Sequence, residues 1–512
     1  MATPNEKLAA SLAQLRKLQD RRRRVFRSGE LTRVHRERLV RNGFLAEVMK
    51  GWLISCSPDA DPGDTTPWFA SFWEFCAAYS TTRFGPDWHL SPEQSLLLHA
   101  ENTVIPRQVI IHTPKGANNS VELLFGTSLF DLRKKDMPPD ADLADRDGLR
   151  FIVPEAALVR VPEAFFVRHP VEAQVVLSGI RDAAQVLGRL LDGGHSVVAG
   201  RLAGAFRRIG RDDVADEILS VMKRAGYDVR EAVPFEAEQV PGAPGRAQAP
   251  IVGRLQSLWE TMRGPVIAAF PEAPGLPSDI ESYLSFVDEI YRNDAYHSLS
   301  IEGYRVTPEM IDRVRTGNWD ADNPDADRHS LDALAARGYW QAFRLVREAV
   351  GEIIGGSEAG ALVREVHRDW YRELLQLCVA SGLIAASTLA GYRNDAVFLR
   401  GSRHVPPRRE AVRDAMPALF DLLETETEPS VRAVLGHWLF GYIHPYPDGN
   451  GRMARFVMNA MLASGGYPWT VIRIEDRDVY MAGLESASVD QDIAPFARFV
   501  ADKVARSLER AT

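Results

Sequence analysis

The stretch from Gly441 to Leu462, "GYIHPYPDGNGRMARFVMNAML", constrains the fold of this chain more than any other part of it. Before it, apolar residues recur at helical spacing, at Val431, Val434, Leu435, Trp438, Leu439 and Tyr442. After it, the same spacing recurs at Met453, Phe456, Val457, Ala460 and Met461, until Gly465 and Gly466 end the pattern. We therefore expect two buried helices joined by the turn "HPYPDGNGR".

The turn has the residue types of an anion site at the start of the second helix. Gly449, Asn450 and Gly451 permit backbone conformations that aim successive N–H groups into one concavity. The positive end of the helix dipole adds to this field, so the turn can hold phosphates. Arg452 and Arg455 lie one helical turn apart and can add charge-assisted contacts.

Two further residues of the turn can do chemistry beside a phosphate. Asp448 supplies a hard oxygen ligand suited to Mg²⁺ carried by a nucleotide. His444 is the group here that titrates near neutral pH, so it can take a proton from an attacking hydroxyl. The seven fixed residues of "HPxxDGNGR" would arise by chance at roughly one site in 10⁹, which makes a purely structural turn a poor explanation.

These residues resemble the signature of the Fic (Fic/Doc) family, HPFx(D/E)GNGRxxR, with Tyr446 in place of the usual phenylalanine. The resemblance implies transfer of AMP from ATP to a hydroxyl side chain of a target protein. It implies His444 as the base, Asp448 as the Mg²⁺ ligand, and a nucleotide site made by Gly449, Asn450, Gly451, Arg452, Arg455 and Asn459. The aromatic ring of Tyr446 should keep the loop geometry, although its hydroxyl needs a partner or a path to water.

The likeness extends to about residues 255–505. Residues 391–423 resemble the family's flap, a short β-hairpin followed by a Pro-Pro turn and a helix, which aligns the target segment by strand addition. Residues 480–500 resemble the closing helices. The resemblance therefore predicts a mainly helical C-terminal half with a β-hairpin flap.

The segment "YHSLSIEGY" resembles the family's inhibitory helix, with Ser298, Glu302 and Gly303 in the S/T-xxx-E-G/N spacing. Its place before the signature resembles the subgroup whose inhibitory segment is N-terminal to the Fic core in the same chain. A carboxylate delivered to Arg455 would occupy the cation that should hold the γ-phosphate of ATP. We therefore expect a self-inhibited adenylyltransferase.

Three other functions of the same loop stay open at this point. Members of the family use the same phosphate-binding turn, called the nest below, for phosphate transfer or for removal of AMP. Alternatively, a Fic core that only senses nucleotide would make the chain a DNA-binding regulator. The intact "GNGR" and both arginines favour ATP as the donor. The chain contains no GxxxxGK[ST], HExxH or GxSxG motif.

At 512 residues the chain exceeds what one hydrophobic core usually serves. Between the two halves, Pro, Gly and Ala replace any periodic apolar pattern. We expect a winged-helix-like region at 1–60, an α+β domain at 61–232, a linker at 233–250 and a Fic domain at 251–512, with the inhibitory helix near 290–304.

The N-terminal half is predicted to be α+β. Extended runs are expected at "QVIIHT" and "VELLFG", and helices at "AQVVLSGIRDAAQVLGRLL" and "DDVADEILSVMKRAGY". A helix over 30–41, followed by two strands around the turn 49–51, has the order of a winged helix. This start resembles the N-terminal region of AbiEi-type antitoxins, and "WHLSPEQSLLLH" through "VELLFG" resembles the domain that follows in them.

The first 50 residues carry 13 Lys and Arg against 5 Asp and Glu, a local charge of +8 in a chain of net charge −8. Arg33, Arg36, Arg38 and Arg41 on the expected helix and Arg21 to Arg24 before it suggest a phosphate-tracking surface, so DNA is one expected partner of residues 1–60. A solvated charged face explains the same pattern equally well. The sequence leaves the oligomeric state open, a homodimer included.

The three cysteines, Cys56, Cys76 and Cys378, lie far apart and are expected to be buried, reduced thiols. His99, His112 and His367 are expected to be structural rather than metal ligands. The first 20 residues mix charges without an apolar core, and the most apolar window, 374–389, is too short and polar to span a membrane. We therefore expect a cytoplasmic protein that does not bind membranes.

Overall fold

The computed structural model describes residues 3–58, 61, 63–235, 249–317 and 331–511. The chain forms two compact units, residues 1–250 together with 398–405, and residues 251–397 together with 406–512. Most of the predicted linker, residues 236–248, lies outside the described part of the chain. The other domain boundaries stay predictions.

The first unit begins with a small α+β module of helices α1 (Pro4–Leu18) and α2 (Arg33–Arg41) and an antiparallel sheet of order β1-β3-β2. Its strands are Val25–Arg27, Leu45–Met49 and Trp52–Ser55. The expected helix over 30–41 begins at Arg33, because Thr32 caps it by accepting from the N–H of His35. The two expected strands lie on either side of Lys50 and Gly51, and Gly51 has a φ of +91°.

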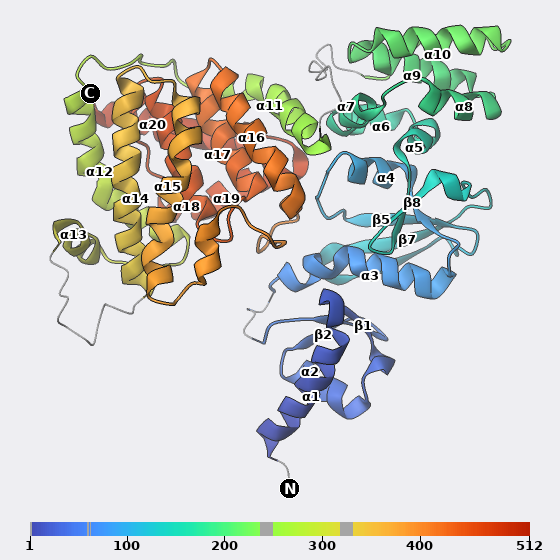
Figure 1. Ribbon diagram of the computed structural model, residues 1–512, viewed down its shortest axis with the longest axis horizontal. Coiled ribbons are helices and arrows are strands. Elements are labelled where there is room, and N and C mark those ends of the chain that lie inside the picture. The colour runs from blue at the N-terminus through green and yellow to red at the C-terminus, as the bar shows by residue number, and fades with distance from the viewer. Residues whose placement is uncertain (1–2, 59–60, 62, 236–248, 318–330, 512) are drawn as a thin grey trace. The chain divides into compact units, whose positions relative to one another are not determined.

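A second sheet in this unit has the order β4-β5-β7-β6, with strands His89–Leu90, Gln108–Thr113, Ser128–Arg133 and Asn119–Glu122. Strands β5 and β7 run parallel, and the other pairs are antiparallel. Helix α3 (Thr66–Phe84) lies between the two sheets (Figure 1) and shares with them a core rich in aromatic rings. "QVIIHT" is a strand as expected, but "VELLFG" is extended only to Glu122, because the chain turns at Phe125 with φ +52°.

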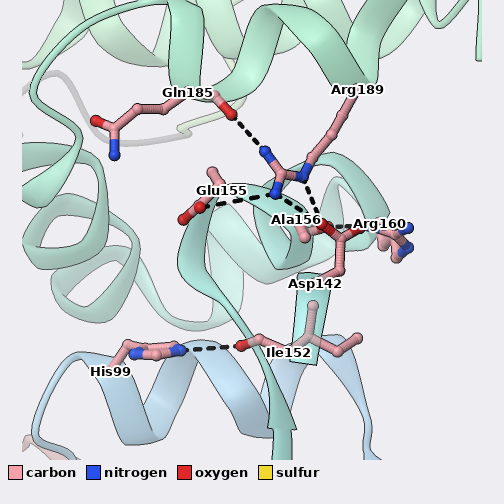
Figure 2. Close-up of polar contacts among 8 residues, drawn as sticks. All are labelled: His99, Asp142, Ile152, Glu155, Ala156, Arg160, Gln185 and Arg189. Atoms are coloured by element: carbon pink, nitrogen blue, oxygen red, sulfur yellow. Dashed lines mark hydrogen bonds and ion pairs between the residues drawn. The ribbon is translucent and has the colours of Figure 1, made fainter. Parts of the chain in front are cut away.

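The unit continues with the hairpin β8 (Leu143–Arg146) and β9 (Leu149–Ile152) and with six helices. These are α5 (Pro154–Arg160), α6 (Ala164–Arg168), α7 (Pro170–Gly179), α8 (Ala184–Asp192), α9 (Ser196–Arg208) and α10 (Asp212–Arg224), with the short α4 (Pro92–His99) packed against α5 and α7. Asp142 joins this helical layer by accepting from Arg160 and Arg189 (Figure 2). The expected helix over 173–191 is two helices, α7 and α8, and the expected helix at 212–227 is α10.

Residues 398–405, from the stretch that resembles the flap, pack within this first unit. The N–H of Ile105 donates to the carbonyl of Arg403 at 2.8 Å, and the guanidinium of Arg403 donates to the carbonyl of Ile105 at 2.9 Å. The predicted β-hairpin is wrong: residues 391–408, all of them described, contain no strand. The backbone of Arg403 pairs with Ile105 instead of a hairpin partner, and Pro406 and Pro407 have no N–H to give a ladder.

The second unit is helical. Its helices are α11 (Pro250–Ala269), α12 (Ile280–Ile301), α13 (Pro308–Thr316), α14 (Leu331–Ile354), α15 (Ala359–Ala380), α16 (Arg409–Thr425), α17 (Pro429–Ile443), α18 (Asn450–Ala463), α19 (Arg477–Glu485) and α20 (Ala494–Ala511). Helix α18 packs against α14, α15 and α17 (Figure 1), and every residue of it except Gly451 is buried. Both core helices expected around the "HPYPDGNGR" turn are confirmed, and so is the helix after the Pro-Pro turn.

Cys76 and Cys378 are buried and unpaired, as expected, whereas Cys56, directly after the end of the central strand β3, is only partly buried. Within the described residues, no helix is long and apolar enough to cross a membrane.

Candidate functional site

The turn between α17 and α18 is closed by its own side chains. His444 ends α17 in the left-handed region, with φ 50° and ψ 60°, and Gly449 begins α18 with φ +78°. The side-chain amide of Asn450 donates to the carbonyl of Tyr446 at 2.8 Å and accepts from its N–H at 2.9 Å. Asn450 therefore fixes the loop's shape through both backbone groups of one residue.

Tyr446 anchors this loop in the core. Its ring is fully buried and stacks on Tyr371 with 3.6 Å between centroids. Among the described residues its hydroxyl has no hydrogen-bond partner, and it lines a cavity of about 150 Å³. Such a cavity has room for water, so the hydroxyl that replaces the usual phenylalanine edge has a path to solvent.

The inhibitory segment reaches the first turn of α18. Arg455 donates from Nε to the hydroxyl of Ser298 at 2.9 Å, and from Nη2 to the carbonyl of Ser298 at 3.0 Å and to Oε1 of Glu302 at 2.7 Å. Ser298 lies on the last turns of α12, and Glu302 caps that helix. Gly303 then turns the chain away with φ +91°.

The carboxylate of Glu302 lies against the N-terminus of α18. A Cβ atom at Gly451 would lie 2.2 Å from Oε1 of Glu302, so only glycine leaves room for this contact. Burial by itself would raise the pKa of Glu302, but the charges of Arg455 and Arg452 outweigh it and the pKa is lowered. An anion therefore already lies in the nest that the sequence predicts for phosphate.

Arg452 and Asp448 form the outer part of the site. Arg452 is 1% exposed and lies over the ring of Tyr304 at 5.1 Å, and its Nη2 is 3.5 Å from Oδ2 of Asp448. Its Nε and Nη1 have no hydrogen-bond partner among the described residues. The Asp448 side chain is 48% exposed and accepts from the N–H of Gly449. These are a buried cation with spare donors and an accessible carboxylate.

His444 is partly buried beside these groups. Burial first, and then the charge of Arg393, lower the pKa of His444 to about 4, although Glu302 and Asp448 act in the opposite direction. The imidazole is therefore neutral at pH 7 and able to accept a proton.

Asn459 is placed one turn beyond Arg455 and is buried. Its amide donates to the carbonyls of Arg455 and Thr470 and accepts from the N–H of Thr470 at 2.8 Å. These bonds tie α18 to the chain that follows it. A role for Asn459 at the nucleotide stays a prediction.

Two functional neighbours, Arg393 and Asp294, were missed from the sequence. The guanidinium of Arg393, 2% exposed, donates to the carbonyl of His444 at 2.7 Å and to that of Pro407. Asp294 is buried one turn before Ser298 and accepts from Tyr339 at 2.6 Å. A signal existed for Asp294, since a carboxylate on the apolar face of a helix, four residues before Ser298, needs a partner; Arg393 carried none, because its partners are carbonyls.

The expected structural roles of His99 and His367 fit their contacts. His99 pairs with the carbonyl of Ile152 at 2.9 Å, which Figure 2 also shows, and His367 with the carbonyls of Val363 and Arg364. His112 lies against the ring of His89. Among the described residues, no three His, Cys, Asp or Glu side chains gather as a metal site.

With this geometry in view, residues 361–462 match the Fic/DOC family. The chain is similar to a protein adenylyltransferase Fic of Nematostella vectensis, at 33% identity over 229 residues, covering 44% of this chain and 49% of that protein. It is also similar to one of Drosophila willistoni, at 29% identity over 225 residues, covering 43% and 41%. The chain spans about half the length of these curated relatives. The match to the Fic/DOC family thus lies within the C-terminal half, where the sequence predicts the Fic domain.

Solved structures that match this chain include a Fic-domain-containing signaling protein from Bacteroides thetaiotaomicron, at 22% identity and a TM-score of 0.35, covering 50% of this chain and 95% of that one. A Fic family protein from Desulfovibrio desulfuricans has 22% identity and a TM-score of 0.35, with 52% and 76% covered.

Proposed function

We propose, from the premise that the C-terminal half contains a Fic domain, that this chain transfers AMP from ATP to a hydroxyl side chain of a target protein. The observation that carries the proposal is the N-terminus of α18, where Gly449 forms the nest and the carboxylate of Glu302 is held 2.7 Å from Arg455. A site that binds one anion in this way suits the phosphates of a nucleotide. The name of the curated relatives supports the same reaction.

In this proposal His444 acts as the general base. It takes the proton of the target hydroxyl, whose oxygen bonds to the α-phosphorus while the bond from that phosphorus to the β-phosphate oxygen breaks and pyrophosphate leaves. Arg393 holds the carbonyl of His444 and is a positioning residue. Arg452 and Arg455 stabilise the charge on the phosphates.

Asp448 fits a magnesium ion that a nucleotide carries. It is a half-exposed carboxylate at the mouth of the nest, and Mg²⁺ in nucleotide sites takes one or two carboxylates with phosphate oxygens and water as its other ligands. When bound, the metal would neutralise charge on the phosphates. Asp448 would orient it toward the nest through its bond from the N–H of Gly449.

Glu302 restrains the reaction in this proposal. Its carboxylate accepts a hydrogen bond from Nη2 of Arg455. The γ-phosphate of ATP must therefore displace the carboxylate before it can bind the guanidinium of Arg455. Two hydrogen bonds from the same guanidinium to the hydroxyl and the carbonyl of Ser298 keep Arg455 in this position. We expect weak basal activity that rises when Glu302 moves away.

Labelled ATP separates this function from its alternatives. Protein-bound label from α-labelled ATP supports AMP transfer, γ-label alone indicates phosphate transfer, and no label with intact ATP binding indicates a nucleotide sensor. Pre-labelled protein that loses AMP with time would identify the de-AMPylation activity.

For residues 1–60 we propose duplex DNA as a partner. The module has helix α2 and a three-stranded sheet, and Arg33 and Arg41 are exposed on α2, whereas Arg38 is partly tied to Lys7 and Ser11. Fluorescence anisotropy should show binding that weakens steeply as salt rises, because arginines release counterions. No binding at low salt would remove DNA from the list of partners. Three unpaired cysteines favour the reducing cytoplasm as the compartment.

A further inference from the structure

The face between helices α15 and α16 carries arginines at regular spacing. Arg364, Arg368 and Arg372 follow one another at one-turn intervals on α15, and Arg413 lies on the first turns of α16. A hollow of about 510 Å³ lies here, and its charged lining residues are Arg364, Arg368 and Arg413. Within the described part of the chain, no carboxylate lines it. The hollow therefore has one sign of charge.

Two of these arginines are not neutralised by an acidic side chain in the described structure. Arg364 is paired with Asp421 and Glu424. In contrast, Arg413 donates to the amide oxygen of Asn394 and to the carbonyl of Arg409. Arg368 lies over the ring of Tyr392, 5.2 Å from its centroid. Two guanidinium groups from two helices thus converge on one hollow with donors to spare.

The walls of the hollow are largely aromatic. Phe420, His367 and Tyr392 line it, and the imidazole of His367 pairs with the hydroxyl of Tyr392 at 3.1 Å. A smaller cavity of about 150 Å³ shares Arg368 and Tyr392 and is also lined by Arg372 and by Tyr446, whose buried hydroxyl has no partner among the described residues. A polar group that enters would meet two arginines and a free hydroxyl.

This face adjoins the proposed catalytic histidine through the chain itself. Tyr392 precedes Arg393, which holds the carbonyl of His444, and Tyr446 is two residues after His444. We propose that the hollow between α15 and α16, called the arginine hollow below, receives a Glu or Asp side chain of the target protein near its modified hydroxyl. This inference rests on the proposed transferase function and names an acidic segment as its substrate class. Planar guanidinium groups match carboxylates, and the one-signed lining attracts them.

The test is peptide binding to the full chain, which does not depend on catalysis. The probes are a fluorescein-labelled peptide with a serine flanked by glutamates and the same peptide with glutamines. We expect saturable binding of the acidic peptide only, weakening as salt rises. Arg368→Gln and Arg413→Gln should each raise its Kd about three- to tenfold, since both side chains are partly solvated, and the double variant more than tenfold.

Arg344→Gln is the matched control, because Arg344 is an exposed arginine on the neighbouring helix α14 and does not line the hollow. It should change the Kd less than twofold, and the thermal midpoint of each variant should stay near that of the wild type. Equal binding of both peptides, unchanged affinity in the double variant, or binding of duplex DNA instead of the acidic peptide would overturn the proposal. Incorporation of α-label with no peptide binding would reject the arginine hollow and leave the transferase function standing. Binding of the acidic peptide without any α-label incorporation would support the arginine hollow as a binding site and reject the transferase function.

Discussion

Each of the two units contains a carboxylate held by arginine, and the two clusters differ in how completely the carboxylate is buried and bound. In the first unit, both oxygens of Asp142 are used, Oδ1 by Arg189 and Oδ2 by Arg160 (Figure 2). In the second, Glu302 is bonded through Oε1 to Arg455. Side-chain exposure follows the same order, 7% for Asp142 and 29% for Glu302.

The difference separates a structural ion pair from one that can open. Removing one partner of a buried, fully bonded pair leaves charges without compensation, which is costly. A carboxylate that accepts one arginine hydrogen bond at a helix end, with its side chain 29% exposed, can leave at a smaller cost. We therefore expect Asp142 to stabilise its unit, whereas the proposed function requires Glu302 to exchange with a phosphate.

The largest expected effect belongs to the proposed transfer reaction, at its proposed base. His444→Ala should lower α-label incorporation about 10²- to 10⁴-fold, because general-base removal commonly costs this much. Folding and ATP affinity should change little, since the imidazole makes no phosphate contact in the proposal. Activity within tenfold of wild type would remove His444 from the role of base.

For the first cluster, Asp142→Ala should lower the free energy of unfolding of the first unit by about 3 kcal/mol, because two guanidinium groups lose their carboxylate. Urea unfolding followed by tryptophan fluorescence measures it, and Asp140→Ala, an exposed carboxylate two residues before it, is the control. A loss below about 1 kcal/mol would place Asp142 in the same class as Glu302.

For the second cluster, Glu302→Gly should raise α-label incorporation about 10- to 150-fold, the equivalent of a charge-assisted pair of 1.5–3 kcal/mol. Ser298→Ala should give a smaller rise, since Arg455 keeps its bond to the carbonyl of Ser298. An unchanged rate in Glu302→Gly would contradict self-inhibition. If this variant gains incorporation and loses AMP removal, Glu302 also assists hydrolysis.

The pH dependence sharpens the comparison further. Because the pKa of His444 is lowered to about 4, the base stays neutral well below the ordinary histidine pKa, and the rate should fall only as pH falls through about 4. With an unshifted histidine, the rate at pH 5 would be about thirtyfold lower than at neutral pH. A pH–rate profile of kcat/KM with the acidic limb near 6.5 would show that the histidine is not buried in solution.

The free energy of unfolding should also depend on pH through the carboxylate of Glu302. Its pKa is lowered in the folded protein, so its contribution is present above the ordinary glutamate pKa and is lost as pH falls through the folded value. The unfolding free energy of Glu302→Gln should therefore fall less than that of wild type below about pH 4.5. An identical pH dependence of the two proteins would argue against the ion pair with Arg455.

Local patterns were enough to predict the two core helices and the turn between them. The apolar residues from Val431 to Tyr442 repeat at the helical period and are all buried, and glycines mark both ends of α18. The pairing of Glu302 with Arg455 followed from the resemblance of "YHSLSIEGY" to the family's inhibitory helix, and the structure brings the two residues together. The conformation of residues 391–408 was not predictable. A hairpin needs a partner strand, and the sequence does not show that the carbonyl of Arg403 accepts from the N–H of Ile105.

The sequence by itself determined the residues of the turn and their order, because these depend on backbone freedom and helical spacing. The carboxylate of Glu302 was indicated by the resemblance to the family's inhibitory helix. The tertiary structure alone decided which side chains are held and which are free to act. Packing made Arg393 a support for His444, bound both oxygens of Asp142 but one of Glu302, and left Arg368 and Arg413 without an acidic partner. Burial and the distances between residues far apart in the chain set these energies, and no local pattern encodes them.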